Sequence, residues 1–373
     1  MRILIINISC DETSVGRICV DTANEAINRG DMAVIAYGRG KVSKRYAGNA
    51  YKICSKADVL WHVIITRLYD RHGFGCKQAT KRFVDWIKEY DPDRIYLHNI
   101  HGYYINIEVL FNYLRECNKE IIWTLHDCWS FTGHCAHYIG LKCDGWRSGC
   151  GTNCPGKNEY PKTIGSKKIA FNYQKKRILF TGIDNLSIIV PCQWLSDQLK
   201  GSFMKDYPVK VVHNEVSKNV YKPTASDYKE KLGIEGKKII LAVASVWTEA
   251  KGLNDLIALR SMLDDGCCIV LVGVNKIQEK KLCDKFVCIR RIENKENLAK
   301  LYTMSDYFVN LTHADTFPTV NLEARACGTT VITYDVGGCR ETIGEEDYLI
   351  DEGAVDLVAK IINGDSRNMH SEC

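Results

Sequence analysis

Two acidic residues, Asp315 and Glu323, lie eight positions apart across a loop that is expected to turn into a helix. Glu323 would lie one turn inside that helix, where its carboxylate can accept two hydrogen bonds from a sugar diol. Asp315 would lie before the helix and reach a second group of the same ligand. Each acid alone also fits a solvated charge at a helix start. Together they indicate a site for a nucleotide sugar.

The residues between the two acids add a phosphate site. Thr316 is expected to cap the helix, and Pro318 suits its first turn, where a missing N–H costs nothing. The free amides of Thr319 and Val320 would then face outward at the positive end of the helix, a position that favours phosphate. The segment from Asp315 to Glu323, which includes Phe317, is therefore predicted to bind the nucleotide sugar that serves as the glycosyl donor.

Lys251 and Gly16 follow predicted strands and complete the predicted donor site. Lys251 stands before Gly252 and a helical run, where its ammonium can neutralise a diphosphate leaving group. Gly16 follows the first strand and lets the backbone approach a phosphate or sugar closely. Taken alone, a surface lysine and a single glycine are weak signals.

Histidines follow two other predicted strands of the first half. His126 ends one strand with Asp127 beside it, and its neutral imidazole can donate a hydrogen bond to a sugar hydroxyl. His98 and His101 lie at the end of the neighbouring strand and are predicted, with Asp127, to contact the acceptor. A lone histidine at a strand end is more often structural, so this assignment depends on the resemblance described below.

A cysteine-rich segment follows His126. The chain has 18 cysteines, and several are concentrated between Cys128 and Cys154. Four thiolates can hold a structural zinc ion tetrahedrally, with His134 and His137 as alternative ligands. Reduced, packed cysteines are the other interpretation, because the spacing lacks the paired motif of a zinc ribbon and a reducing compartment disfavours disulfides. The predicted zinc ligands are Cys135, Cys143, Cys150 and Cys154.

In this order, the motifs resemble the GT-B retaining glycosyltransferases of family 4, and among them the exopolysaccharide or colanic-acid-type enzymes. The acid-x7-acid element matches the family's EX7E motif, with Asp315 in place of the first glutamate. The resemblance spans nearly the whole chain. Its other elements are the N-terminal strand and loop, His126–Gly133, Lys251-Gly252, Val331–Thr333 and Gly337–Glu341.

The resemblance implies a reaction and residue roles. It implies retaining hexosyl transfer, in which the acceptor attacks the face from which the diphosphate leaves and the departing phosphate serves as base. Asp315 would orient the donor sugar, Glu323 the ribose and Lys251 the diphosphate. His126 would line the reaction centre, so His126, Asp315 and Lys251 are the expected catalytic residues. The implied donor is a UDP- or GDP-sugar, and no cofactor is required for catalysis.

Two departures from the family pattern bear on this expectation. The arginine that accompanies the family's lysine is missing, because Ser245 or Val246 stands at its place, and Arg290 or Arg291 is the predicted substitute. The family closes its cleft with a C-terminal helix that crosses to the first lobe. Only a few residues follow Ile362, so we expect this segment to be short or absent.

Short β-branched runs alternate with helical patterns along the chain, which is typical of α/β proteins with parallel sheets. Two successive series predict two Rossmann-like lobes, and the resemblance implies the GT-B fold, in which the lobes face each other across a cleft. We expect the acceptor-side lobe over residues 1–215, with a cysteine-rich insertion at 128–154, and the nucleotide-sugar lobe over residues 216–373. The expected strands are Arg2–Ile8, Met32–Tyr37, Arg94–Leu97, Ile121–Leu125, Ser187–Pro191, Val209–His213, Lys238–Ala244, Cys268–Gly273, Phe286–Ile289, Tyr307–Leu311 and Thr330–Tyr334.

The net charge of +5 is divided unevenly along the chain. Residues 1–215 carry 30 Lys and Arg against 21 Asp and Glu, or +9, and the remainder carries 20 against 24, or −4. A basic first half can attract a lipid-linked or oligosaccharide acceptor, or an anionic membrane. Residues 57–71 are predicted to be either an interfacial helix at the inner membrane or a core helix with a basic edge.

Hydropathy and motif content narrow the function class. No apolar run approaches the ~20 residues that cross a bilayer, so a cytoplasmic protein is expected. Nothing resembles a nucleic-acid-binding module. The leading hypothesis is an enzyme of exopolysaccharide or capsule biosynthesis. A nucleotide-sugar epimerase is an alternative, although the acid-x7-acid element argues against it. The second alternative is a catalytically inactive, zinc-stabilised GT-B binding protein, because the family arginine is missing at Ser245.

Overall fold

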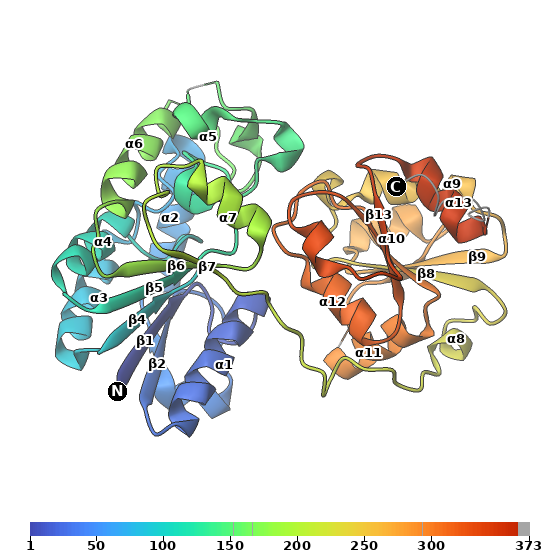
Figure 1. The fold of residues 1–373 in the computed structure, drawn as a ribbon, viewed down its shortest axis with the longest axis horizontal. Helices are drawn as coiled ribbons and strands as arrows, with labels where there is room; N and C mark the ends of the chain where they lie inside the picture. Colours follow the sequence, from blue (N-terminus) through green and yellow to red (C-terminus); the bar gives the residue numbers. More distant parts are fainter. Residues whose placement is uncertain (152, 166, 293, 365–373) are drawn as a thin grey trace. The chain divides into compact units, whose positions relative to one another are not determined.

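A computed structural model describes residues 1–364 except 152, 166 and 293. The chain forms two compact units, each with its own parallel sheet (Figure 1): Met1–His213, here unit 1, and Asn214–Cys373, here unit 2. The division lies two residues before the boundary expected from the sequence. Positions 365–373, and with them the end of the expected C-terminal crossing segment, lie outside the described residues.

Unit 1 is built on a parallel sheet with the strand order β3-β2-β1-β4-β5-β6-β7. Ile3, Leu4, Ile5 and Ile6 of the central strand β1 are all fully buried, as expected for a strand covered on both faces. The strands are β1 (Arg2–Asn7), β2 (Met32–Tyr37), β3 (Ala50–Lys52), β4 (Arg94–Leu97), β5 (Glu120–Thr124), β6 (Leu186–Val190) and β7 (Val209–Val211). The helices are α1 (Ser14–Asn28), α2 (Lys56–Tyr69), α3 (Lys77–Tyr90), α4 (Ile107–Glu116), α5 (Gly145–Ser148), α6 (Ile169–Phe180) and α7 (Gln193–Lys200).

Unit 2 repeats this architecture with the strand order β10-β9-β8-β11-β12-β13. All six residues of β9 are buried, so this strand is also covered on both faces. The strands are β8 (Lys238–Val243), β9 (Cys267–Val272), β10 (Val287–Ile289), β11 (Tyr307–Asn310), β12 (Thr330–Tyr334) and β13 (Tyr348–Ile350). The helices are α8 (Tyr228–Lys231), α9 (Leu253–Met262), α10 (Lys276–Leu282), α11 (Lys295–Met304), α12 (Thr319–Ala326) and α13 (Val355–Asn363).

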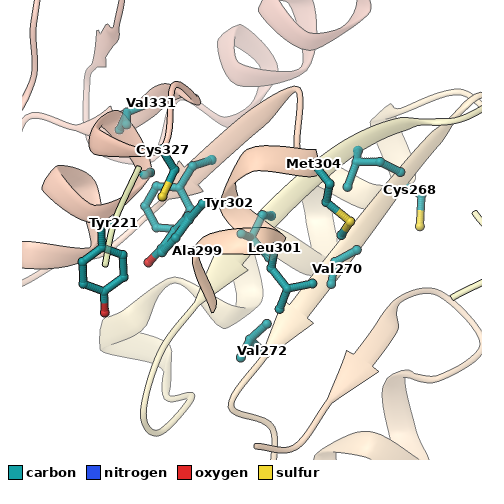
Figure 2. Close-up of a cluster of buried hydrophobic side chains, with 14 of the residues drawn as sticks. Tyr221, Cys268, Val270, Val272, Ala299, Leu301, Tyr302, Met304, Cys327 and Val331 are labelled. Atoms are coloured by element: carbon teal, nitrogen blue, oxygen red, sulfur yellow. The ribbon is translucent and has the colours of Figure 1, made fainter. Parts of the chain in front are cut away.

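Helices cover both faces of the sheet in unit 2. In Figure 1, α9, α10 and α13 lie on one side of β8 and β9, and α8, α11 and α12 lie on the other. The core between α11, α12 and the sheet is centred on the fully buried ring of Tyr302, which lies near Tyr221 and Cys327 (Figure 2). Tyr302 meets the ring of Phe308 edge-on, with ring centroids 5.4 Å apart. This core supports α12, the helix that begins in the predicted donor segment.

The α/β prediction with two Rossmann-like lobes is confirmed. Each expected strand is present within two residues of its predicted bounds. The sequence analysis missed β3 and β13, which have three residues each and lie at sheet edges. Strands this short do not show a clear alternating or continuous apolar pattern.

Candidate functional site

Lys251 and Asp315 meet at one edge of the sheet in unit 2. Lys251 ends the 3-10 helix Glu249–Lys251 that follows β8, and Asp315 lies in the loop after β11. Because β8 and β11 are neighbouring parallel strands, the loops that follow them lie side by side. Lys251 Nζ and Asp315 Oδ2 are 2.6 Å apart, and both side chains are partly exposed. The ammonium predicted to bind phosphate and the carboxylate predicted to bind sugar therefore form one charged pair.

Helix α12 begins at Thr319, with Pro318 immediately before it. The prediction that Thr316 caps this helix is therefore wrong, and Pro318 occupies the capping position instead of the first turn. Asp315 Oδ1 accepts a hydrogen bond from the N–H of Phe317 at 3.2 Å, so residues 315–317 form a turn and the helix starts later. The first backbone N–H groups of α12 still lie at the positive end of its dipole, where an anion is stabilised.

Glu323 is held from the core of unit 2. Tyr302 donates a hydrogen bond from its hydroxyl to Glu323 Oε2 at 3.0 Å, and the tyrosine side chain is fully buried. Burial and the nearby carboxylate raise the pKa of Tyr302 well above its ordinary value, so the hydroxyl keeps its proton. The bond fixes the orientation of the carboxylate that is predicted to bind ribose. Sequence reasoning missed Tyr302, because an aromatic residue in an amphipathic helix is typical of a core position.

His313, two residues before Asp315, is a second feature that the sequence analysis missed. Its Nδ1 lies 2.7 Å from Glu352 Oε1, and its Nε2 lies 3.3 Å from Asp255 Oδ2. The hydroxyl of Tyr334 donates to the same Asp255 oxygen at 2.7 Å. These contacts tie the loop after β11 to α9 and to the end of β12. The only sequence signal for this bridge was a histidine just after a strand.

Two glycines leave no room for a side chain. Gly252 has a φ of +76°, and a Cβ atom there would lie 2.0 Å from the carbonyl oxygen of Leu311. The turn that carries the predicted phosphate-binding lysine therefore packs directly on the end of β11. A Cβ atom on Gly16 would lie 2.7 Å from the carbonyl oxygen of Cys10, so this glycine lets α1 approach the loop after β1. Its contact with the donor stays a prediction.

Arg290 and Arg291, the predicted substitutes for the missing arginine, follow β10 at one edge of the sheet. Arg290 pairs with Glu279 of α10 at 3.2 Å. Strand β9 separates β10 from β8, so these arginines follow a strand two positions away from the one that precedes Lys251. That Arg290 or Arg291 replaces the missing arginine stays a prediction. The strand order argues against it, because it places both residues away from Lys251.

Arg340 is another arginine near the donor edge, in the loop after β12. Because β12 pairs with β11, this loop neighbours the one that carries Asp315. Arg340 forms an ion pair with Asp335. Cys339 is adjacent to Arg340. Burial, and to a smaller extent the charge of Asp315, raises the pKa of the Cys339 thiol to about 12. The effect of Asp315 shows that this loop lies close to the Lys251–Asp315 pair.

Unit 1 brings the predicted acceptor residues together at the carboxyl edge of its own sheet. Strands β4 and β5 are neighbours, and His98 and His126 follow them. His98 Nδ1 and His126 Nε2 are 3.0 Å apart. His101 Nε2 lies 2.8 Å from Asp127 Oδ2, and its Nδ1 lies 3.2 Å from the Tyr160 hydroxyl. These four predicted residues all line one small hollow at this edge.

Burial sets the protonation states at this edge. Burial lowers the pKa of His126 to about 4 and that of His98 well below its ordinary value, so both rings are neutral at pH 7. Burial also tends to raise the pKa of Asp127. However, His101 lowers the pKa of Asp127 through its charge and its hydrogen bond, and the backbone N–H of Trp129 lowers it further. The Asp127 pKa therefore lies well below its usual range. Neutral imidazoles beside an ionised carboxylate suit a polar, uncharged ligand such as a sugar.

The segment after His126 is organised around a buried lysine. Lys176 of α6 is almost inaccessible, and its Nζ donates to the carbonyl oxygens of Trp129 at 2.7 Å and Thr132 at 3.1 Å. The ammonium lies 3.5 Å from the centre of the Trp129 ring. Beside it, the buried Asp70 lies 2.7 Å from His134 Nδ1. Burial lowers the pKa of Lys176 to about 7. The side-chain nitrogen of Lys176 thus donates to the carbonyl groups of this loop in either protonation state.

The zinc site at the cysteine-rich segment stays a prediction. Over the part of the chain that the structure describes, no group of three or more His, Cys, Asp and Glu side chains is arranged to hold a metal ion. His134, one alternative ligand, is engaged with Asp70. The free thiols of the predicted site are those of Cys135, Cys143, Cys150 and Cys154.

Comparison with known proteins finds a family match within unit 2. Residues 225–367, most of unit 2, match the family described as "Glycosyl transferases group 1". Unit 2 carries a group 1 glycosyl transferase domain. For these residues the match agrees with the resemblance that the sequence motifs indicated, and the matched region contains Lys251, Asp315 and Glu323.

Two relatives extend this comparison. The chain is 28% identical over 171 residues to the putative colanic acid biosynthesis glycosyl transferase WcaC of Escherichia coli (strain K12), a match that covers 43% of this chain and 41% of the relative. It is 29% identical over 116 residues to the N,N'-diacetylbacillosaminyl-diphospho-undecaprenol alpha-1,3-N-acetylgalactosaminyltransferase of Campylobacter jejuni, which covers 30% of each protein. The matches therefore span less than half of either relative.

A solved structure covers nearly the whole chain. The Anabaena protein Alr3699/HepE in complex with UDP-glucose superposes with a TM-score of 0.65 and 16% sequence identity, over 99% of this chain and 91% of the Anabaena chain. Because the sequence identity is only 16%, this similarity shows the fold alone, and the fold is GT-B. Among the described residues, no helix is both long enough and apolar enough to cross a membrane.

Proposed function

We propose that this protein is a retaining glycosyltransferase that moves a hexosyl unit from a nucleotide sugar to a lipid-linked or oligosaccharide acceptor in surface polysaccharide synthesis. The observation that carries this proposal is the Lys251–Asp315 pair, next to the first turn of α12 in a group 1 glycosyl transferase domain. The complex of the Anabaena protein with UDP-glucose supports the donor class. The colanic acid and diphospho-undecaprenol named for the two relatives support the acceptor class.

At the donor end, unit 2 supplies charge and orientation. As the bond between the anomeric carbon and the diphosphate breaks, negative charge develops on the leaving phosphate. The Lys251 ammonium and the first N–H groups of α12 stabilise that charge. Asp315 orients the donor sugar, and Glu323, held by Tyr302, binds the ribose hydroxyls.

At the acceptor end, unit 1 supplies polar contacts. The acceptor hydroxyl attacks the anomeric carbon from the face that the diphosphate leaves, and its proton passes to an oxygen of the departing phosphate. No protein base is required for this step, so the chain contributes position and electrostatic stabilisation. His126 offers a hydrogen bond to a sugar hydroxyl, and His98, His101 and Asp127 are the proposed acceptor-contacting residues at the same edge.

The same proposal includes peripheral contact with the cytoplasmic face of a membrane through α2. The two buried residues of this helix are His62 and Thr66, both polar. Several of its apolar side chains are exposed, with Leu60 62% and Trp61 61% accessible, and Val59, Val63 and Ile65 are partly buried. A helix with such an exposed apolar face suits the headgroup region of a bilayer. The full exposed apolar set of α2 is Leu60, Trp61, Ile64, Leu68 and Tyr69.

Flotation with liposomes tests the membrane contact. Wild-type protein is expected to float with vesicles that contain anionic lipid, and the double variant Leu60→Ser/Trp61→Ser is expected to remain at the bottom. Met262→Ser, which changes an exposed apolar residue of unit 2, is the matched control and should float like the wild type. Equal flotation of all three proteins would remove α2 from the proposal.

The donor is tested by thermal shift with UDP-, GDP- and ADP-sugars. A sugar nucleotide at 100 times its dissociation constant should add about 2.7 kcal/mol of stability, which is a visible shift in melting temperature. The Lys251→Ala variant is the control, and it should lose most of this shift. If no nucleotide sugar stabilises the wild type, the proposed donor site is wrong.

The reaction is tested with the donor found in that screen and a lipid-linked acceptor. Release of nucleoside diphosphate only when acceptor is present supports a transferase, and the anomeric configuration of the product, read by NMR, tests retention. Conversion of the donor without an acceptor would indicate an epimerase. Tight donor binding without turnover on any acceptor would favour an inactive binding protein.

A further inference from the structure

Two histidines of unit 1 share one hydrogen bond. His98 follows β4 and His126 follows β5, and the parallel pairing of these strands places them in neighbouring loops. His98 Nδ1 lies 3.0 Å from His126 Nε2, with the ring planes inclined by 18°. The backbone of His98 is fixed as well, because its carbonyl oxygen accepts the indole N–H of Trp123 at 3.2 Å. The contact therefore joins two rings whose positions are set by the sheet.

Only one of the two rings can donate in this contact. Burial lowers the pKa of both histidines, that of His126 to about 4, so both imidazoles are neutral at pH 7. A neutral imidazole carries one N–H and one lone pair. Whichever ring donates, the choice also fixes whether the second nitrogen of His126, its Nδ1, carries a proton or a lone pair.

The surroundings of His98 favour one arrangement. Its Nε2 is buried and, in the part of the chain that is described, has no hydrogen-bond partner. If His98 carried its proton on Nε2, that buried N–H would be unpaired. If it carries the proton on Nδ1, only a lone pair is unsatisfied, and buried acceptors without a partner are less rare than buried donors without one. His98 therefore donates from Nδ1, and His126 accepts at Nε2.

We propose that His98 is a positioning residue that holds His126 as the Nδ1–H tautomer, so that His126 offers its ligand a hydrogen-bond donor. His98 is 3% exposed, whereas His126 is only partly buried, so His126 is the ring that reaches a ligand. The ligand atom that it faces is then an acceptor, such as a hydroxyl or phosphate oxygen. The identity of the ligand as a glycosyl substrate rests on the proposed function, but the tautomer does not.

The tautomer is measured directly by NMR on protein whose histidine rings are labelled with 15N. The His126 signals are assigned by their loss in His126→Gln, and at pH 7.5 they are expected to show a protonated Nδ1 and an unprotonated Nε2. A protonated Nε2 on His126 would overturn the proposal. This measurement needs neither substrate nor activity, so it remains decisive even if the proposed function is wrong.

Two variants of His98 then test its positioning role. In His98→Asn, the side-chain amide can donate from about the place of Nδ1, so the His126 tautomer should persist and kcat/KM should stay within about threefold of wild type. In His98→Leu, the donor is lost, so His126 should show mixed tautomers and kcat/KM should fall about tenfold. Unchanged His126 shifts in a folded His98→Leu protein would refute the role. If that variant does not fold, the wild-type spectrum alone decides.

Discussion

Lys251 Nζ and Asp315 Oδ2 lie 2.6 Å apart, although the two residues are 64 positions apart in the chain. The pair holds the loop after β8 against the loop after β11. A diphosphate would compete with Asp315 for the ammonium, and its binding would release the carboxylate for the donor sugar. One ion pair therefore links phosphate binding to sugar binding.

Removal of the ammonium is the first prediction. Lys251→Ala should lower turnover at least tenfold, because the developing phosphate charge loses the ammonium that stabilises it. Glu323→Ala should have an effect of similar size. Steady-state kinetics with saturating acceptor measure both. Lys285→Ala, at an exposed position of unit 2, is the control and should retain wild-type turnover. Wild-type rates in both site variants would contradict the donor assignment.

Tyr302→Phe is expected to weaken donor binding while leaving the fold intact. Phenylalanine keeps the edge-on packing against Phe308, but the bond to Glu323 is lost. Hydrogen bonds to charged groups contribute roughly 1.5–3 kcal/mol, so donor affinity should fall about tenfold or more. Calorimetric titration of the donor gives this value. Tyr348→Phe on the edge strand β13 is the control, and an equal loss there would argue against a specific role for Tyr302.

A third prediction concerns pH and His126. Its pKa is about 4 in the folded protein and about 6.5 in the unfolded chain, so the unfolded chain binds more protons at this position between those values. The contribution of His126 to stability should therefore be complete above pH 6.5 and be lost as pH falls toward 4. Urea unfolding of wild type and His126→Gln at pH 4.5, 5.5 and 7 gives the difference. A difference that does not change with pH would contradict the assigned neutral ring.

Lys176→Met tests the buried ammonium. Methionine fills a similar volume, but the carbonyl groups of Trp129 and Thr132 lose their donor, so unfolding free energy should fall by about 2 kcal/mol. Urea unfolding at pH 7 measures this loss. Lys175→Met, at the partly exposed neighbour that pairs with Glu108, should change stability by less than about 1 kcal/mol. Equal effects of the two changes would mean that the carbonyl contacts contribute little.

The sequence could predict the residues that meet by strand order. Lys251 and Asp315 each follow a strand that the sequence predicts, and His98 and His126 do the same in unit 1, so their meeting follows from parallel topology. Tyr302 could not be found in this way, because its contact with Glu323 depends on how α11 packs against α12. The cap prediction at Thr316 fails because the turn made by the Asp315 side chain delays the helix by two residues. The burial of Lys176 could not be predicted either, since a run of basic residues suggests a surface and charge alone does not reveal burial.

The exposed apolar face of α2 has a practical consequence for handling the protein. With Trp61 and Leu68 facing outward, copies purified from lipid should adhere to one another or to column resin through this helix. Gel filtration in plain buffer should show aggregated material that a mild detergent disperses, so crystallisation trials would start from the Leu60→Ser/Trp61→Ser form.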